Sequence, residues 1–281
     1  MRKFAIGAAV SGALALSALA VPSASAATPD LTFSNVVVNN DKAIVVGTTS
    51  TVKVPITYTL THPVDLVIDN KTGIAGIAGI ALYRGSSLSK MQNEMESDDI
   101  PNCTTTSTTA TTVTNSCTEV IAIEPQDYFS GASDAGTWKV AGFYGLSTST
   151  TDDSGDHLSF NYGYDMWGGL GTTQIKRAAK LTTDATPEPV TKGKTLTVKG
   201  ALTRADWETS KYSGYTGQPV ALQFKAKGAT AYKTVKTVTS GSKGALTTTV
   251  KASADGSYRY SFAGTTTTGA TTATGDYVDV K

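Results

Sequence analysis

The sequence predicts an all-β chain of two tandem β-sandwiches, and three observations carry this prediction. Of the 281 residues, 47 are threonine, and β-branched side chains favour pleated strands. Apolar and polar residues alternate along several stretches, which is typical of strands with one buried face. Gly- and Ser-rich turns separate these stretches at intervals of about ten residues, the spacing typical of a sandwich. A hydrophobic content of 40% is enough for packed cores.

The first 26 residues have the layout of a secretory signal peptide. Arg2 and Lys3 give a positive start, residues 4–20 are apolar or small, and Ala24-Ser25-Ala26 forms a small-x-small cleavage motif. We therefore expect cleavage after Ala26 and a secreted, extracellular product. An uncleaved membrane anchor is the alternative, but the apolar run is shorter than the roughly 20 residues that a span needs.

The mature product, residues 27–281, is expected to be close to neutral. Removing Arg2 and Lys3 from the 24 basic residues leaves 22 against 23 acidic ones, a net charge of −1. Such a chain offers no basic field for a phosphate backbone, so we expect no nucleic-acid partner. No later apolar run is long enough to span a bilayer, so we expect no membrane span after cleavage.

We expect two globular units, at residues 27–178 and 179–281, each of a size that suits a single domain. Pro187 and Pro189 lie in the segment that follows the boundary, where they favour extended or turn conformations.

In the first unit, strands are expected at residues 33–38, 43–46 and 52–61. The third of these alternates strictly for ten residues, which indicates one buried face. Pro55 falls on its polar side and lacks an N–H, so we expect this strand at a sheet edge or with a bulge.

Two further stretches of the first unit are less regular. Residues 73–82 contain a Gly-Ile-Ala repeat whose period of three fits neither a strand nor a long helix. We interpret it as a flexible hairpin arm, which would be a sticky edge if exposed. Leu88, Met91 and Met95 lie at helical spacing and predict a short helix over residues 88–96.

Cys103 and Cys117 predict one disulfide within the first unit. Two cysteines fourteen positions apart in an exported chain most simply pair with each other. They bracket a Thr-rich segment that would fray if flexible, and closing a ring of this size is worth roughly 3 kcal/mol in the chain-entropy model. A redox pair is the alternative, but the sequence has neither CxxC spacing nor a basic neighbour.

The second unit shows a regular series of short strands. They are expected at residues 196–198, 220–224, 232–238, 246–250 and 258–262, separated by turns.

The second unit also resembles a known group of modules. The segments that carry the resemblance are DATPEPV (184–190), KGKTLTVKG (192–200), YTGQPV (215–220) and GDYVDV (275–280). They are similar to repeated segments of secreted actinobacterial proteins with immunoglobulin-like β-sandwich modules, most of them of uncharacterised function. The resemblance covers about 179–281 and is weaker over 27–178. It implies two immunoglobulin-like sandwiches and an extracellular location, and it implies no activity and no site residues.

The sequence contains no recognisable catalytic constellation, so we expect a protein that is not an enzyme. His62 and His157 are the only histidines, and the segment around Ser133 lacks the final glycine of a nucleophile elbow. The HExxH pattern of zinc hydrolases is absent.

We expect no cofactor, with calcium as the alternative. Asp152, Asp153 and Asp156 form a dense acidic loop, and carboxylates are ligands that calcium prefers. The spacing is not that of an EF-hand, and a solvated loop is the competing interpretation.

Aromatic residues give the best candidate for a binding site. Trp207, Tyr212 and Tyr215 lie among polar residues in a connecting segment, as on a recognition surface. The competing interpretation is that Trp207 folds under the sandwich as a core plug. A second set alternates along one strand and forms either a sugar-stacking platform or core: Phe160, Tyr162 and Tyr164.

These observations predict a secreted, non-catalytic binding or structural protein of the extracellular space or cell surface. Its expected partner is a cell-wall polysaccharide or a surface protein. One alternative is a carbohydrate- or cell-wall-binding module that uses exposed aromatic rings, and the other is a calcium-stabilised adhesin.

Overall fold

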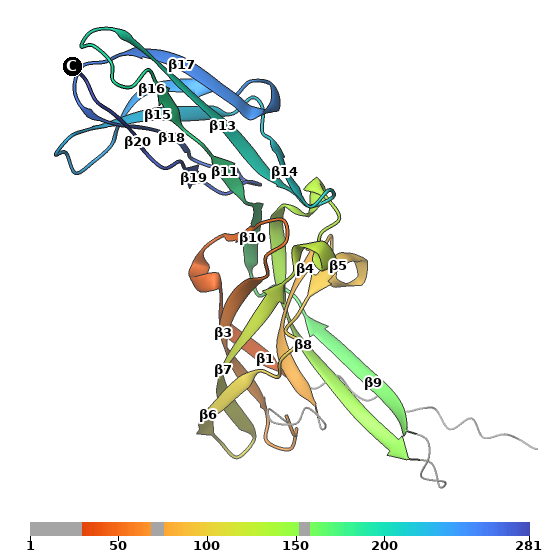
Figure 1. The fold of residues 1–281 in the computed structure, drawn as a ribbon. Coiled ribbons are helices and arrows are strands. Elements are labelled where there is room, and N and C mark those ends of the chain that lie inside the picture. The colour runs from red at the N-terminus through yellow and green to blue at the C-terminus, as the bar shows by residue number, and fades with distance from the viewer. Residues whose placement is uncertain (1–29, 69–75, 152–157) are drawn as a thin grey trace, which may run out of the picture.

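The computed structural model describes residues 30–68, 76–151 and 158–281, and for residues 146–151 and 158–163 it describes the backbone alone. Two β-sandwiches follow each other along the chain and meet at a bend (Figure 1). The predicted fold class, an all-β chain of two tandem sandwiches, is confirmed. The proposed signal peptide lies outside the described residues.

The first sandwich consists of a four-stranded and a six-stranded sheet. The four-stranded sheet has the order β1-β3-β7-β6: Thr32–Val38, Val52–Pro63, Thr112–Ile123 and Asn102–Thr108. The other has the order β2-β10-β8-β4-β5, with β9 also on β8: Ile44–Val46, Thr172–Arg177, Gly136–Thr151, Ile77–Gly85, Met91–Met95 and Leu158–Trp167. Short helical turns connect them: η1 (Asn39–Asp41), η2 (Leu88–Lys90), α1 (Pro125–Tyr128) and η3 (Ala132–Asp134).

The core of the first sandwich follows the alternation in the sequence. On β3, Val54, Ile56, Tyr58 and Leu60 are buried, while Pro55 and Thr57 between them are exposed. Strand β3 lies between β1 and β7, and it pairs with β7 without a register shift, so Pro55 lies neither in an edge strand nor at a bulge of β3. The shift in the β1–β3 pairing is on β1, between Ser34 and Val37. Pro55 is nevertheless tolerated, because β1 pairs with β3 only as far as Val38 opposite Ile56, one residue short of Pro55.

Two predictions for the first sandwich need correction. Residues 88–96 form no α-helix: the short 3-10 turn η2 ends at Lys90 and is followed by β5, in which Met95 pairs with Leu82 and is buried. The described part of the Gly-Ile-Ala repeat is neither an arm nor an exposed edge. It forms the first part of β4, which pairs with β8 from Ile77 and with β5 only from Leu82 onward, and in which Ile80 is completely buried.

The disulfide is confirmed. Cys103 and Cys117 are directly opposite each other on β6 and β7, with their Cα atoms 4.1 Å apart. The Thr-rich segment between them is not a loose loop, because most of it belongs to this β-hairpin.

The second sandwich consists of two five-stranded sheets. The first has the order β11-β13-β12, with β14 and β17 also on β13: Ala179–Leu181, Thr195–Asp206, Asp184–Thr186, Lys211–Gly214 and Ala245–Lys251. The second has the order β16-β15-β18-β19, with β20 also on β18: Lys233–Thr239, Pro219–Ala226, Gly256–Phe262, Thr271–Thr272 and Asp276–Val278. Turn η4 (Ser242–Gly244) precedes β17.

Between these two sheets, alternate residues pack into a separate core. Leu196 and Val198 of β13 face Leu222 of β15 and Tyr260 of β18. The Tyr260 hydroxyl donates a hydrogen bond of 2.9 Å to the Val198 carbonyl oxygen, so this buried aromatic residue also satisfies its polar atom.

Candidate functional site: the junction between the sandwiches

An aromatic stack joins the two sandwiches. Trp207 follows β13 of the second sandwich, yet its ring belongs to the core of the first and is 3% exposed. It stacks on Phe129 with a centroid distance of 4.1 Å and an interplanar angle of 22°. Phe129 in turn meets the buried Trp138 edge to face at 6.0 Å. The Trp207 indole N–H donates a 2.8 Å hydrogen bond to the Gly47 carbonyl, so its polar atom is satisfied too.

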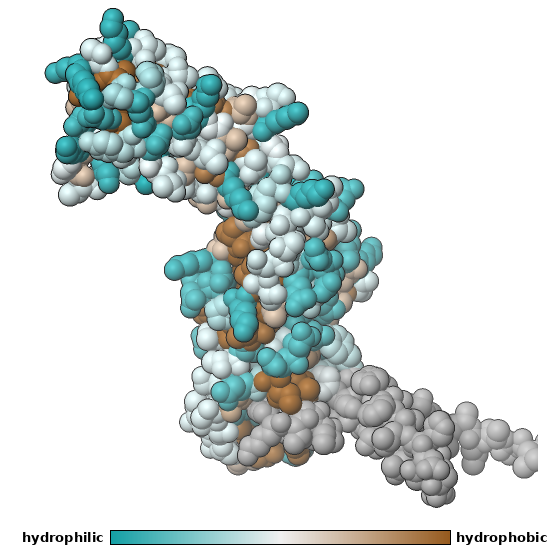
Figure 2. All heavy atoms as spheres, in the orientation of Figure 1, coloured by the Kyte–Doolittle hydropathy of each residue, from teal (hydrophilic) through white to brown (hydrophobic). Residues whose placement is uncertain are grey.

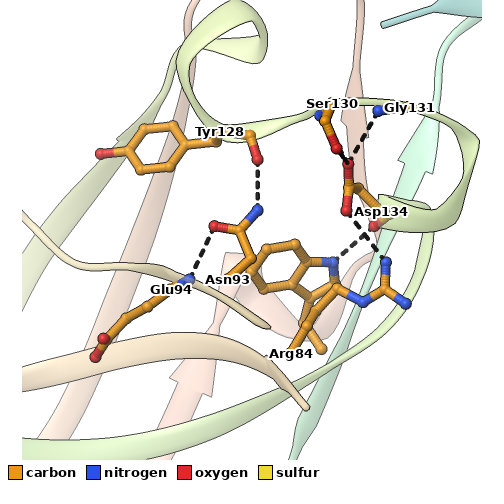
Figure 3. A network of polar contacts seen from close by, with 8 residues as sticks. Arg84, Asn93, Glu94, Tyr128, Ser130, Gly131 and Asp134 are labelled. Carbon is orange, nitrogen blue, oxygen red and sulfur yellow. Dashed lines mark hydrogen bonds and ion pairs between the residues drawn. The ribbon is translucent and has the colours of Figure 1, made fainter. Parts of the chain in front are cut away.

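A polar network fixes the segment that carries Phe129 (Figure 3). The Asp134 carboxylate accepts hydrogen bonds from the backbone N–H groups of Ser130 and Gly131, at 2.8 and 3.1 Å. Arg84 contacts its other oxygen at 3.4 Å, and the Trp138 indole N–H donates to the Asp134 carbonyl at 2.9 Å. The Asp134 carboxylate therefore ties the loop to Arg84 on β4. The backbone carbonyl of Asp134 holds the indole ring of Trp138, which packs against Phe129.

Backbone hydrogen bonds also cross the junction. Ala178 donates to Val46 and accepts from Ala205, both at 2.8 Å. Arg177, the last residue of β10, donates to Thr267 at 3.0 Å and accepts from Gly269 at 2.9 Å. The connecting segment is thus bonded on both sides, unlike a flexible linker whose backbone is solvated.

A basic pair lies within the junction. Arg177 is 7% exposed and is next to Arg204. Burial, and secondly the charge of Arg204, lowers the pKa of Arg177 below its ordinary value. The Arg177 Nε and the neighbouring Thr268 hydroxyl are buried, and neither has a hydrogen-bond partner among the described residues. Burying this cation costs free energy that the surrounding packing has to offset.

The aromatic loop predicted as a sugar-binding site is a structural element. As the competing interpretation expected, Trp207 is buried in a hydrophobic core, but this is the core of the first sandwich and not of its own. Tyr212 packs partly against the same core and carries Lys180 over its ring at 3.9 Å. Tyr215 lies under Arg204 at 4.0 Å and packs edge to face on Phe262. The three rings do not form an exposed platform, because Trp207 is buried and Tyr212 and Tyr215 pack against the cores of the first and the second sandwich.

The other predicted site residues are scattered. His62 is buried and hydrogen-bonded to Asn115, and Ser133 lies in η3. Tyr164 is 45% exposed, stacks on Phe143 and donates to the Glu94 carboxylate at 3.0 Å. The side chains of Phe160 and Tyr162, the His157 residue and the predicted calcium ligands Asp152, Asp153 and Asp156 lie outside what the structure describes. Within the described ranges, no group of three or more His, Cys, Asp or Glu residues could hold a metal ion.

The sequence interpretation missed a buried acid, Glu119. It shares the inward face of β7 with Cys117 and Ile121, and it is 7% exposed. One carboxylate oxygen accepts a 2.8 Å hydrogen bond from the Ile80 N–H on the opposite sheet. Burial raises the pKa of Glu119 to about 8, with the charge of Glu96 adding to the effect. The sequence does contain a sign of this burial, because the alternation along the strand places residue 119 on the same side as the apolar residues Cys117 and Ile121.

Comparison with known proteins gives fold-level neighbours only. The sequence matches no protein-family model and no curated protein. Among solved structures, it is similar to a crystal structure of domains from titin, with 10% identity over 85% of this chain and a TM-score of 0.22. It is also similar to the ectodomain (Ig1–Ig3) of mouse nectin-like molecule 4, with 15% identity over 88% of the chain and a TM-score of 0.22. The chain spans 62% and 65% of the length of these two proteins. Structural similarity at such a low TM-score supports no conclusion about the chain.

Among the residues that the structure describes, none forms a helix of the length and hydrophobicity needed to cross a bilayer.

Proposed function

We propose that the chain is a non-catalytic extracellular structural and binding protein, in which a buried junction fixes two sandwiches as one rigid unit. The observation that carries the proposal is the Trp138–Phe129–Trp207 stack, which takes a side chain from the second sandwich into the core of the first. A rigid pair of sandwiches holds surfaces at a defined spacing, which is what a scaffold or a surface-displayed binder requires.

The surface is consistent with an extracellular protein. On the face shown in Figure 2, hydrophobic residues form small patches among polar ones, one of them at the waist where the sandwiches meet. The Cys103–Cys117 disulfide is compatible with an oxidising compartment. Secretion itself remains a proposal. Sequencing the N-terminus of the protein recovered from the culture medium of its native host tests it. A chain that begins at Ala27 is expected, and absence of the protein from the medium, or a chain that retains Arg2, contradicts it.

Calorimetry tests the rigid junction. If the stack couples the two cores, the full mature chain unfolds in one cooperative transition. Replacing Phe129 by alanine removes the central ring, so we expect the transition to split in two as the sandwiches unfold separately. Phe224→Ala is the control, because Phe224 packs within the second sandwich alone. It should lower the stability without separating the transitions. Two transitions in the unmodified chain would contradict the proposal.

The calcium alternative remains a separate prediction. If Asp152, Asp153 and Asp156 bind calcium, a chelator should lower the melting temperature of the mature chain, and replacing the three by asparagine should abolish that effect. An unchanged melting temperature removes this alternative.

A further inference from the structure

One face of the second sandwich carries two basic residues beside a tyrosine ring. It is the outer face of β15 and β18, on which Gln223, Lys225, Ser257 and Arg259 point away from the core. The intervening residues point inward, and Tyr258 and Tyr260 among them are buried. The strand register places Gln223 opposite Arg259 and Lys225 opposite Ser257, so these four side chains form a compact group.

A tyrosine ring lies across this group. Tyr232, in the connection between β15 and β16, has the Arg259 guanidinium 3.7 Å and the Lys225 ammonium 5.1 Å from its ring centroid. Its hydroxyl fits against Gly275, where any larger residue would collide with it. Arg259 is itself held by a 2.9 Å hydrogen bond from its Nε to the Gln223 side chain. The ring and the guanidinium are therefore fixed, yet Tyr232 remains partly exposed and outside the hydrophobic core.

The two cations of this group are not neutralised by protein. Neither Lys225 nor Arg259 forms an ion pair with any residue in the described ranges, 30–68, 76–151 and 158–281. The nearby Asp255 is already engaged, because Lys227 approaches it at 3.6 Å and the Val280 N–H donates to it at 2.9 Å. A fixed guanidinium and an ammonium beside a partly exposed ring favour an anionic group on a ligand that also has an apolar face.

We propose that Tyr232, Arg259, Lys225 and Gln223 form a binding site for an acidic polysaccharide. A sugar ring packs against Tyr232, and its carboxylate is bound by Arg259 and Lys225. Two cations suit a ligand with one charge per sugar. Anionic lipid surfaces are typically recognised by clusters of about 4–8 basic residues, and nucleic acids present a denser row of charges. This inference names a ligand class for the proposed extracellular binding protein, and it does not depend on the rigidity of the junction.

The test is the affinity of mature 27–281 for polygalacturonate, measured by calorimetric titration at low salt. Fully methyl-esterified polygalacturonate has the same sugar rings without the charge, and poly-glutamate has the charge without the rings. We expect binding to polygalacturonate alone among the three. Tyr232→Ala and Arg259→Gln should each weaken it by about tenfold or more, and Tyr232→Phe should retain it because the ring remains.

Lys251→Gln is the matched control. It removes one positive charge from β17, on the other sheet of the same sandwich, where Lys251 is exposed. We expect its affinity to equal that of the unmodified chain. Tyr232 lies outside the core, so Tyr232→Ala should fold, which an unchanged melting temperature would verify. The proposal is overturned if polygalacturonate fails to bind. Equal binding of poly-glutamate, or an equal loss in Lys251→Gln, also overturns it, because the attraction would then be charge alone.

Discussion

At the residue scale, Glu119 makes the free energy of unfolding depend on pH. Its folded-state pKa of about 8 is above the ordinary value of 4.5, so the folded protein holds a proton that the unfolded chain has lost between these two pH values. The contribution to folding is therefore largest below about pH 4.5 and declines as the pH rises toward 8, by about 1.4 kcal/mol per pH unit at most. Tyr58, whose own pKa burial raises, stays protonated throughout this range.

Glu119→Gln should remove this dependence. The amide oxygen still accepts the hydrogen bond from Ile80, and the neutral group carries no buried charge. We expect the two proteins to differ least near pH 5 and the variant to be the more stable by an increasing margin up to pH 8. Urea unfolding across this range measures the difference. Glu208→Gln, at an exposed position, is the control and should show no such trend. A constant difference across the range would contradict the account.

Residues near each other in sequence could be predicted, and residues brought together by the tertiary fold could not. The Cys103–Cys117 pair followed from spacing and compartment. Trp207 could be recognised as either plug or surface, but its partner Gly47 is 160 positions away, and nothing in the local sequence links them. The same applies to Glu119, whose parity was visible while its contact with Ile80 was not.

At the scale of elements, strict alternation proved a better guide than spacing alone. The alternating run at 52–61 is β3, whereas the helical spacing of Leu88, Met91 and Met95 was misleading, because β5 supplies a partner strand for β4. The period-three repeat was misread because its glycines suggested flexibility. In the sheet they instead allow close packing, a requirement that only the tertiary structure reveals.

Gly79 tests this explanation of β4. A Cβ atom there would lie 2.8 Å from the Phe143 ring and 2.9 Å from a Glu119 carboxylate oxygen, so neighbouring groups would have to move. We expect Gly79→Ala to lower the free energy of unfolding by about 1–3 kcal/mol. In Gly145→Ala, on the adjacent strand β8, the nearest atom would be 3.9 Å away, an ordinary contact. Denaturant unfolding compares the two, and an equal or larger loss for Gly145→Ala would refute the packing argument.

At the scale of the whole molecule, the junction turns two sandwiches into one body. The connecting segment is hydrogen-bonded to both sides, and the aromatic stack continues from the core of the first sandwich to the end of β13. A face on the second sandwich, such as that around Tyr232, is then held at a fixed position relative to the long β8–β9 hairpin of the first (Figure 1).

The measurement that tests this central claim most directly is a set of residual dipolar couplings from both sandwiches of the mature chain in one weakly aligning medium. If the junction is rigid, couplings from residues 30–177 and 179–281 fit a single alignment tensor with the orientation in the structure. In Trp207→Ala, which removes the shared ring, the two sets should require separate tensors. Separate tensors of different magnitude in the unmodified protein would show that the sandwiches move independently, and would contradict the account.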